Sequence, residues 1–132
     1  MLDVLHSLRA NFPDKIRMGV KDKGRVVFVD AREMVSAEAH GNYVLLRSTA
    51  GTHLLRETLA AVATLLAPYG FLRIHRSVLI NTAFVEAIEP GPGGEWVVRT
   101  RTGSEYHVTR TYRRNLRGLA KCWLGTDEFA SN

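Results

Sequence analysis

Apolar and polar residues alternate along residues 71–81, which predicts an extended strand with one buried face. Arg76 interrupts the alternation, because a cation stands where an apolar residue is required. Burying an unpaired charge is costly, so we expect the chain to bend there and to present Arg76 with its two neighbours. A bend that carries three donors favours binding to an anion or a base edge. The alternating positions are apolar Leu72, Ile74, Val78 and Ile80 and hydrogen-bonding Arg73, His75 and Ser77.

Strand-like patterns separated by short turns cover most of the remaining chain. The connections are rich in glycine, and short connections favour antiparallel pairing. The glycine- and proline-rich residues 90–94 predict a hairpin loop, since the Lys-Ser/Thr pair of a phosphate-binding loop does not follow them. We therefore expect a mainly β fold. The predicted strands are 16–20, 25–29, 34–39, 43–47, 53–55, 84–88, 96–100 and 105–108.

Three segments have helical periodicity. Residues 57–67 place Leu59, Val62 and Leu66 on one face, and Pro68 and Gly70 end the pattern. Residues 2–12 form a shorter amphipathic pattern before Pro13, which suits either a helix packed on its own domain or part of a linker or dimer helix.

The third helical pattern combines an apolar stripe with a basic one. Its apolar residues are Tyr112, Leu116, Leu119 and Trp123, spaced i, i+4, i+7 and i+11. The basic residues Arg110, Arg113, Arg114, Arg117 and Lys121 lie on the other side of such a helix. We expect the apolar stripe to dock the helix and the basic stripe to meet phosphate. A solvated face with cations near the negative end of the helix dipole is the alternative.

Composition limits the classes of function. A chain of 132 residues suits one domain, and its net charge of +5 with a pI near 9.8 favours a polyanionic partner. Cys122 is the single cysteine, so no intramolecular disulfide forms. No secretory signal is present, and no apolar run approaches the roughly 20 residues that span a membrane. These features favour the cytoplasm.

Catalytic and metal-binding patterns find little support. No Gly-x-Ser-x-Gly elbow accompanies the pair His75 and Ser77. The five histidines are scattered without the spacing of a zinc site, and Cys122 beside Trp123 is typical of a packed small hydrophobe rather than a nucleophile. We expect neither an enzyme nor a cofactor or metal.

Binding residues recur in combination. His40, Gly41 and Asn42 form a turn between strands, and an asparagine amide suits the edge of adenine, although Gly and Asn also suit an ordinary turn. Arg76 and Arg110 could bond guanine through two nitrogens or simply pair with phosphate. Together these features favour nucleic acid.

At the level of motifs, residues 16–120 resemble the LytTR DNA-binding domain. The resemblance rests on Glu38-Ala39-His40-Gly41-Asn42-Tyr43-Val44, Arg56-Glu57-Thr58-Leu59, Phe71-Leu72-Arg73-Ile74-His75-Arg76-Ser77, Asn81 and Val108-Thr109-Arg110-Thr111-Tyr112. Thr109 stands where the family usually has serine, which keeps a hydroxyl. Residues 78–80 replace a stretch that usually contains an aromatic residue.

This resemblance implies an elongated arrangement of small antiparallel sheets with short helices. It also implies a bacterial transcription regulator of the response-regulator, two-component kind, which reads the major groove of double-stranded DNA through loops, at direct repeats and as a homodimer. Arg73 becomes a phosphate or structural arginine, and Arg117 a phosphate contact. The implied DNA-binding residues are His40, Asn42, Tyr43, Arg73, His75, Arg76, Ser77, Thr109, Arg110, Arg113 and Arg117.

The predicted organisation is an N-terminal helix or linker over 1–15, the DNA-binding domain over 16–124 and a tail over 125–132. An upstream receiver or sensor domain is a further expectation. The alternative function is a non-catalytic RNA-binding or protein-interaction module that uses the same basic face. RNA readers usually expose aromatic residues on a sheet, whereas Phe28, Phe71, Phe84 and Trp96 lie in apolar contexts that predict a core.

Overall fold

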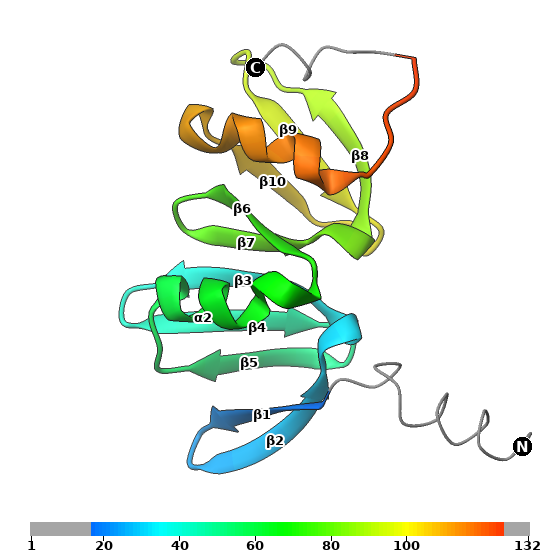
Figure 1. The fold of residues 1–132 in the computed structure, drawn as a ribbon. Helices are drawn as coiled ribbons and strands as arrows, with labels where there is room; N and C mark the ends of the chain where they lie inside the picture. Colours follow the sequence, from blue (N-terminus) through cyan, green and yellow to red (C-terminus); the bar gives the residue numbers. More distant parts are fainter. Residues whose placement is uncertain (1–16, 126–132) are drawn as a thin grey trace, which may run out of the picture.

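The chain folds into three small antiparallel sheets stacked along one direction (Figure 1). The computed structural model describes residues 17–125, so the amphipathic pattern of residues 2–12 lies outside the described part. At one end, β1 (Arg17–Asp22) pairs with β2 (Arg25–Asp30). Their two-residue turn, Lys23 and Gly24, has positive φ at both positions, as a tight hairpin requires.

The central sheet has five strands and the last sheet three. In the order β5-β4-β3-β7-β6, the central strands are Gly51–Leu55, Tyr43–Ser48, Met34–His40, Val78–Asn81 and Phe71–His75. In the order β10-β9-β8, the last sheet contains Glu105–Val108, Trp96–Thr100 and Val85–Pro90. Each of these pairings is antiparallel. The predicted mainly β, elongated fold class is confirmed.

Helix α2 (Leu59–Leu66) covers one face of the central sheet (Figure 1). It begins where the Thr58 hydroxyl accepts a hydrogen bond from the amide of Ala61 at 3.1 Å. The predicted helix is therefore confirmed but shorter than 57–67. It continues into the 3-10 turn η2 (Ala67–Tyr69) and stops at Gly70, whose φ of 88° favours glycine.

Two apolar cores lie on either side of the hairpin β6–β7. Phe71 and Leu79 belong to the core beneath α2, whereas Ile74 and Ile80 belong to the core beneath the three-stranded sheet. The buried amide of Asn81 fixes the end of β7, because it donates to the carbonyl of Met34 at 2.8 Å and accepts from Ala83 at 3.0 Å. Both cores thus share these two strands.

Residues 71–81 form a complete hairpin, so the predicted single strand with a bend is wrong in extent. The reversal occurs at Arg76 and Ser77, directly where the alternation is broken. The interruption therefore marks a turn between two strands. Two further short 3-10 helices, η1 (Ala31–Glu33) and η3 (Thr82–Phe84), each begin where an Asp or Asn side chain accepts a backbone amide.

The C-terminal helical segment η4 (Arg110–Leu119) has 3-10 geometry and ends before Lys121 and Trp123. Leu116 is fully buried, and Trp123 packs on the same core from beyond the helix, so the apolar stripe docks η4 as expected. Two predictions of burial are wrong, one for Cys122 after η4 and one for Phe28 in β2. Cys122 is exposed rather than packed, and Phe28 is 62% exposed beneath the guanidinium of Arg17.

Among the described residues, no helix is long and apolar enough to cross a membrane. The same part of the chain contains no group of three or more His, Cys, Asp or Glu side chains placed to hold a metal ion.

Candidate nucleic-acid interface

The turn between β3 and β4 presents polar side chains to solvent. Gly41 adopts a φ of 60°, which allows the chain to reverse over two residues. His40 and Asn42 are exposed, and Tyr43 is 40% exposed although it lies in a strand. Within residues 17–125, the Asn42 amide has no protein hydrogen-bond partner. Its donor and acceptor are therefore both available to an external ligand.

The turn between β6 and β7 is held by its own side chains. The Arg73 guanidinium donates to the carbonyls of His75, at 3.3 Å, and of Arg76. His75 Nδ1 accepts from the backbone amide of Ser77 at 3.1 Å and lies 2.9 Å from the Ser77 hydroxyl. Because Nδ1 accepts, a neutral His75 ring carries its proton on Nε2, which can donate outward.

Arg76 occupies the tip of this turn. Its side chain is exposed, and it forms no ion pair or hydrogen bond with the described part of the protein. A guanidinium that is free to bond on two nitrogens matches the acceptors of guanine or a phosphate. In contrast, the Arg73 guanidinium already donates hydrogen bonds within the turn, and it lies 5.8 Å from the ring centre of Tyr112. These contacts favour a structural role for Arg73 over a contact with phosphate.

The third segment is the start of η4. The amide of Thr109 donates to the carbonyl of Ile74 at 3.2 Å, which ties this segment to β6. The Thr109 side chain makes no capping hydrogen bond, so its hydroxyl remains available. Arg110 and Arg117 are exposed, whereas Arg113 is half-buried and lies 5.9 Å from the ring centre of Trp96. The predicted basic stripe is thus interrupted at Arg113.

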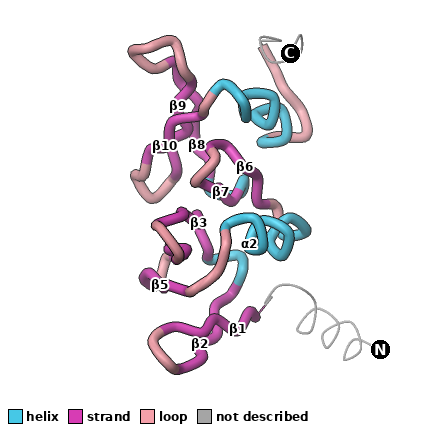
Figure 2. The backbone as a smooth tube through the Cα atoms, turned by 90° about the vertical axis from the view of Figure 1, so that its left-hand side faces the viewer, coloured by secondary structure: helices cyan, strands magenta, loops and turns pink. Residues whose placement is uncertain are grey.

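Hydrogen bonds to backbone carbonyls bring the three segments to one edge of the molecule. The amide of Ala39, next to the first turn, donates to the carbonyl of Ser77 in the second turn at 2.9 Å. The side chain of Asn115 in η4 donates to the carbonyl of Arg73 at 2.7 Å. Figure 1 shows both turns and the start of η4 on the left, and in Figure 2 this edge faces the viewer. The predicted residues therefore converge.

A partly buried hydrogen-bond network connects the first turn to the three-stranded sheet. Glu38 accepts from Arg47 Nε at 2.7 Å and from the Tyr106 hydroxyl at 2.9 Å. The Tyr106 hydroxyl also lies 2.8 Å from the Ser36 hydroxyl, and His40 lies 3.5 Å from Glu38. Sequence patterns did not single out Glu38 or Tyr106 for this role, because their 68-residue separation gives no local signal.

This network changes the pKa values of its acids. Burial raises the pKa of Glu38, but the hydrogen bonds from Arg47 and Tyr106 outweigh it, so the pKa lies below its ordinary value. Burial raises the pKa of Tyr106, and the hydrogen bond to the Glu38 carboxylate raises it further. Glu38 is therefore an anion that Arg47 and Tyr106 hold in place beside His40.

Residues 24–121 match the family model described as the LytTr DNA-binding domain. The chain belongs to this family. Such membership supports DNA binding in transcription regulation, and the family is one of DNA-binding domains rather than of enzymes. These findings agree with the arrangement of three polar segments on one edge.

Named relatives extend the comparison. Sensory transduction protein LytT of Bacillus subtilis is 27% identical over 71% of this chain and 39% of its own length. The CO-responsive transcriptional regulator RcoM of Rhodospirillum rubrum is 33% identical over 70% of this chain and 39% of its own length. This LytTr chain therefore spans about two fifths of the length of these curated relatives.

A solved structure shares the fold. It is the LytTr DNA-binding domain of a putative methyl-accepting/DNA response regulator from Bacillus cereus, with a TM-score of 0.70. The match covers 82% of this chain and 99% of that domain, at 21% sequence identity. At this identity the likeness establishes the fold alone.

Proposed function

We propose that this LytTr chain binds double-stranded DNA sequence-specifically and reads the major groove through its β3–β4 turn, its β6–β7 turn and the start of η4. The observation that carries the proposal is the convergence of these segments on one edge, linked by the Ala39–Ser77 and Thr109–Ile74 backbone hydrogen bonds. The major groove is about 12 Å wide and admits a two-stranded β-ribbon, so the tip of a hairpin can enter it.

Each segment has a role that follows from its free groups. Arg76 is assigned to guanine, and Asn42 to adenine, because each side chain can form two bonds to that base. His75 Nε2 and the hydroxyls of Ser77, Tyr43 and Thr109 supply further donors. The cations Arg110 and Arg117 are assigned to phosphate, while Arg73 supports the β6–β7 turn. His40 lies in the same turn as Asn42 and supplies a further polar group there, and Arg113 is assigned to phosphate together with Arg110 and Arg117.

The wider biological setting is also part of the proposal. We infer a bacterial transcription regulator that acts in the cytoplasm, binds direct repeats as a homodimer on DNA and receives its signal from a receiver or sensor domain. The net charge of +5 supports attraction to DNA without indicating a sequence.

Selection of bound sites from a pool of random duplexes tests this function. We expect enrichment of a repeated, spaced sequence, and loss of one conserved base position with Arg76→Ala. Recovery of an unenriched pool at physiological salt would contradict sequence-specific binding. The alternative RNA-binding function predicts instead that single-stranded RNA competes as well as the selected duplex, so the same assay should include it as competitor.

A further inference from the structure

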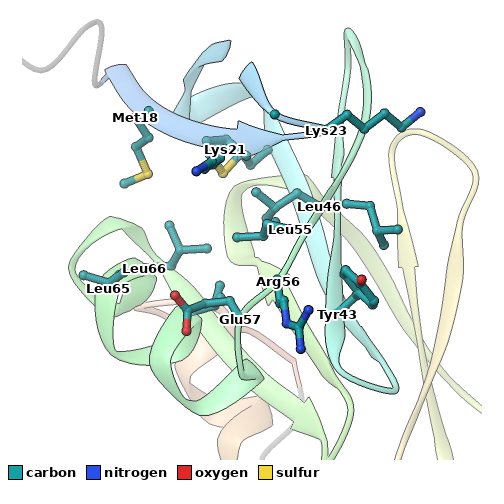
Figure 3. A pocket seen from close by; sticks show the side chains of 16 residues that line it. Met18, Lys21, Lys23, Tyr43, Leu46, Leu55, Arg56, Glu57, Leu65 and Leu66 are labelled. Carbon is teal, nitrogen blue, oxygen red and sulfur yellow. The ribbon is translucent and has the colours of Figure 1, made fainter. Parts of the chain in front are cut away.

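A groove of about 610 Å³ opens between the β1–β2 hairpin, β5 and α2 (Figure 3). Strand β4 contributes Leu46 and Tyr43 to its lining. Small-molecule sites in proteins typically measure roughly 300–1,000 Å³. The groove therefore has the size of a ligand site, and its location differs from that of the β6–β7 turn and η4.

The groove wall is largely apolar and includes side chains that face water. Leu65 on α2 is 66% exposed, although the buried core residues Val62 and Leu66 belong to the same lining. Half-buried Met18 and Leu55 also belong to this apolar part. An apolar ligand that covers these side chains would remove them from water, which is favourable. Contact with DNA, which is polar at its surface, would not explain this wall.

The charges at the groove are mainly positive. Lys21, Lys23 and Arg56 line it, and none of them pairs with an acidic side chain of residues 17–125. Glu57 is the acidic residue in the lining, and its carboxylate accepts from the Thr58 amide at 3.3 Å. Figure 3 places Arg56 beside Tyr43 at one end and Met18 with Leu65 at the other.

We propose that this groove binds a small organic anion with an elongated apolar body, such as a medium-chain carboxylate. Its apolar body lies along Leu55, Leu65 and Met18. Its carboxylate pairs with the Arg56 guanidinium, which can form two parallel hydrogen bonds to it. The combination of an apolar wall with unpaired cations, Arg56 among them, favours this class over a neutral apolar compound or a purely ionic one.

The groove also touches the first DNA-binding segment, since Tyr43 lines it and follows the β3–β4 turn. If the proposed function holds, ligand and DNA affect each other's affinity by the same factor. The test of the ligand site uses no DNA, so failure of either proposal is distinguishable from failure of the other.

Titration of the full chain with decanoate, followed by two-dimensional amide NMR, tests the site. We expect saturable shifts of residues on β1, β5 and α2 at concentrations below micelle formation. Decanol, which has the same body without the charge, should bind about tenfold more weakly, because it lacks the charge-assisted hydrogen bonds. Acetate, which has the charge without the body, should cause no saturable shift.

Two pairs of variants separate the apolar and charged contributions. Leu65→Gln should weaken both decanoate and decanol, whereas Leu124→Gln, at a residue 87% exposed and outside the groove, should change neither. Arg56→Gln should reduce decanoate binding to the level of decanol, whereas Arg25→Gln, at an exposed residue outside the lining, should not. All four positions are at the surface, so the native spectrum confirms folding of each variant.

Three results would overturn the proposal. One is the absence of saturable shifts from the groove residues. A result in which only residues 1–16 shift would count equally against the site. Another is equal affinity for decanoate and decanol, which would reject an anion site. The third is unchanged decanoate binding in both Leu65→Gln and a second groove variant, Met18→Gln.

Discussion

At the scale of single residues, the absence of protein partners around Arg76 allows a sharp prediction. Because its side chain is exposed at the tip of the β6–β7 turn, Arg76→Ala should leave the free energy of unfolding unchanged. It should cost about 1–3 kcal/mol of binding at one base pair and relax the preference there. Affinity measurements on the selected duplex and on each single-base variant would check this. A uniform loss across all sequences would contradict the base-contact role.

Arg117 is the matched cation for this comparison, since it is exposed on η4 rather than at a turn. Arg117→Ala should weaken binding to every duplex about equally and reduce the slope of log affinity against log salt by about one unit. Binding isotherms at several salt concentrations would measure that slope. If Arg117→Ala instead changes the base preference, its assignment to phosphate is wrong.

At the scale of secondary-structure elements, the Glu38–Tyr106 hydrogen bond joins β3 to β10 and thereby two sheets. Tyr106→Phe removes this bond and the contact to Ser36, so we expect a loss of about 1–2 kcal/mol in the free energy of unfolding. Denaturant titration would measure it. Tyr69→Phe is the control, because Tyr69 is exposed and has no hydroxyl partner among the described residues. Equal stability of both variants would refute the role of the bond.

The lowered pKa of Glu38 makes the free energy of unfolding depend on pH. Burial raises this pKa, but Arg47 and Tyr106 lower it more, so the folded pKa lies below the unfolded one. The unfolded state therefore binds the proton more readily, and stability falls as the pH decreases below about 4.5, the ordinary pKa of a glutamate carboxyl. Glu38→Gln should flatten the pH dependence in that window. An unchanged slope in denaturation experiments across it would contradict this assignment.

Elements also show where prediction from sequence succeeds. The strands and α2 could be predicted because apolar spacing and the Thr58 cap are local signals. The hairpin at Arg76 and Ser77 could not, since it contains no glycine or asparagine. Its reversal depends on the Arg73 guanidinium and the His75 ring, which hydrogen-bond to the turn itself. Side-chain contacts of this kind do not appear in a pattern of apolar and polar positions.

At the scale of the whole molecule, the two cores that share β6 and β7 fix the positions of the three polar segments. The fold class followed from strand spacing and from the family resemblance. The joining of the sheets did not, because it depends on contacts between residues far apart in sequence, such as Ser36 and Tyr106. The contact of Arg113 with Trp96 is also between residues far apart in sequence. Helical spacing alone therefore placed Arg113 in the basic stripe.

The elongated edge leads to a prediction about how copies bind DNA. If two copies bind direct repeats and contact each other, both must lie on the same face of the duplex. B-DNA repeats about every 10.5 base pairs, so inserting five base pairs between half-sites moves the second copy to the opposite face. We expect this insertion to reduce binding of two copies to that of independent single copies, and an insertion of ten to restore it partly.

Gel-shift titrations that resolve one and two bound copies would measure this effect. A duplex with one half-site scrambled is the control, because it reports the affinity of a single copy without a neighbour. Cooperative binding that does not vary with spacing would contradict contact between copies on one face. Strict one-to-one binding to the intact repeat would contradict the direct-repeat proposal, while sequence-specific reading by Arg76 and Asn42 would still be tested by base substitution in the remaining half-site.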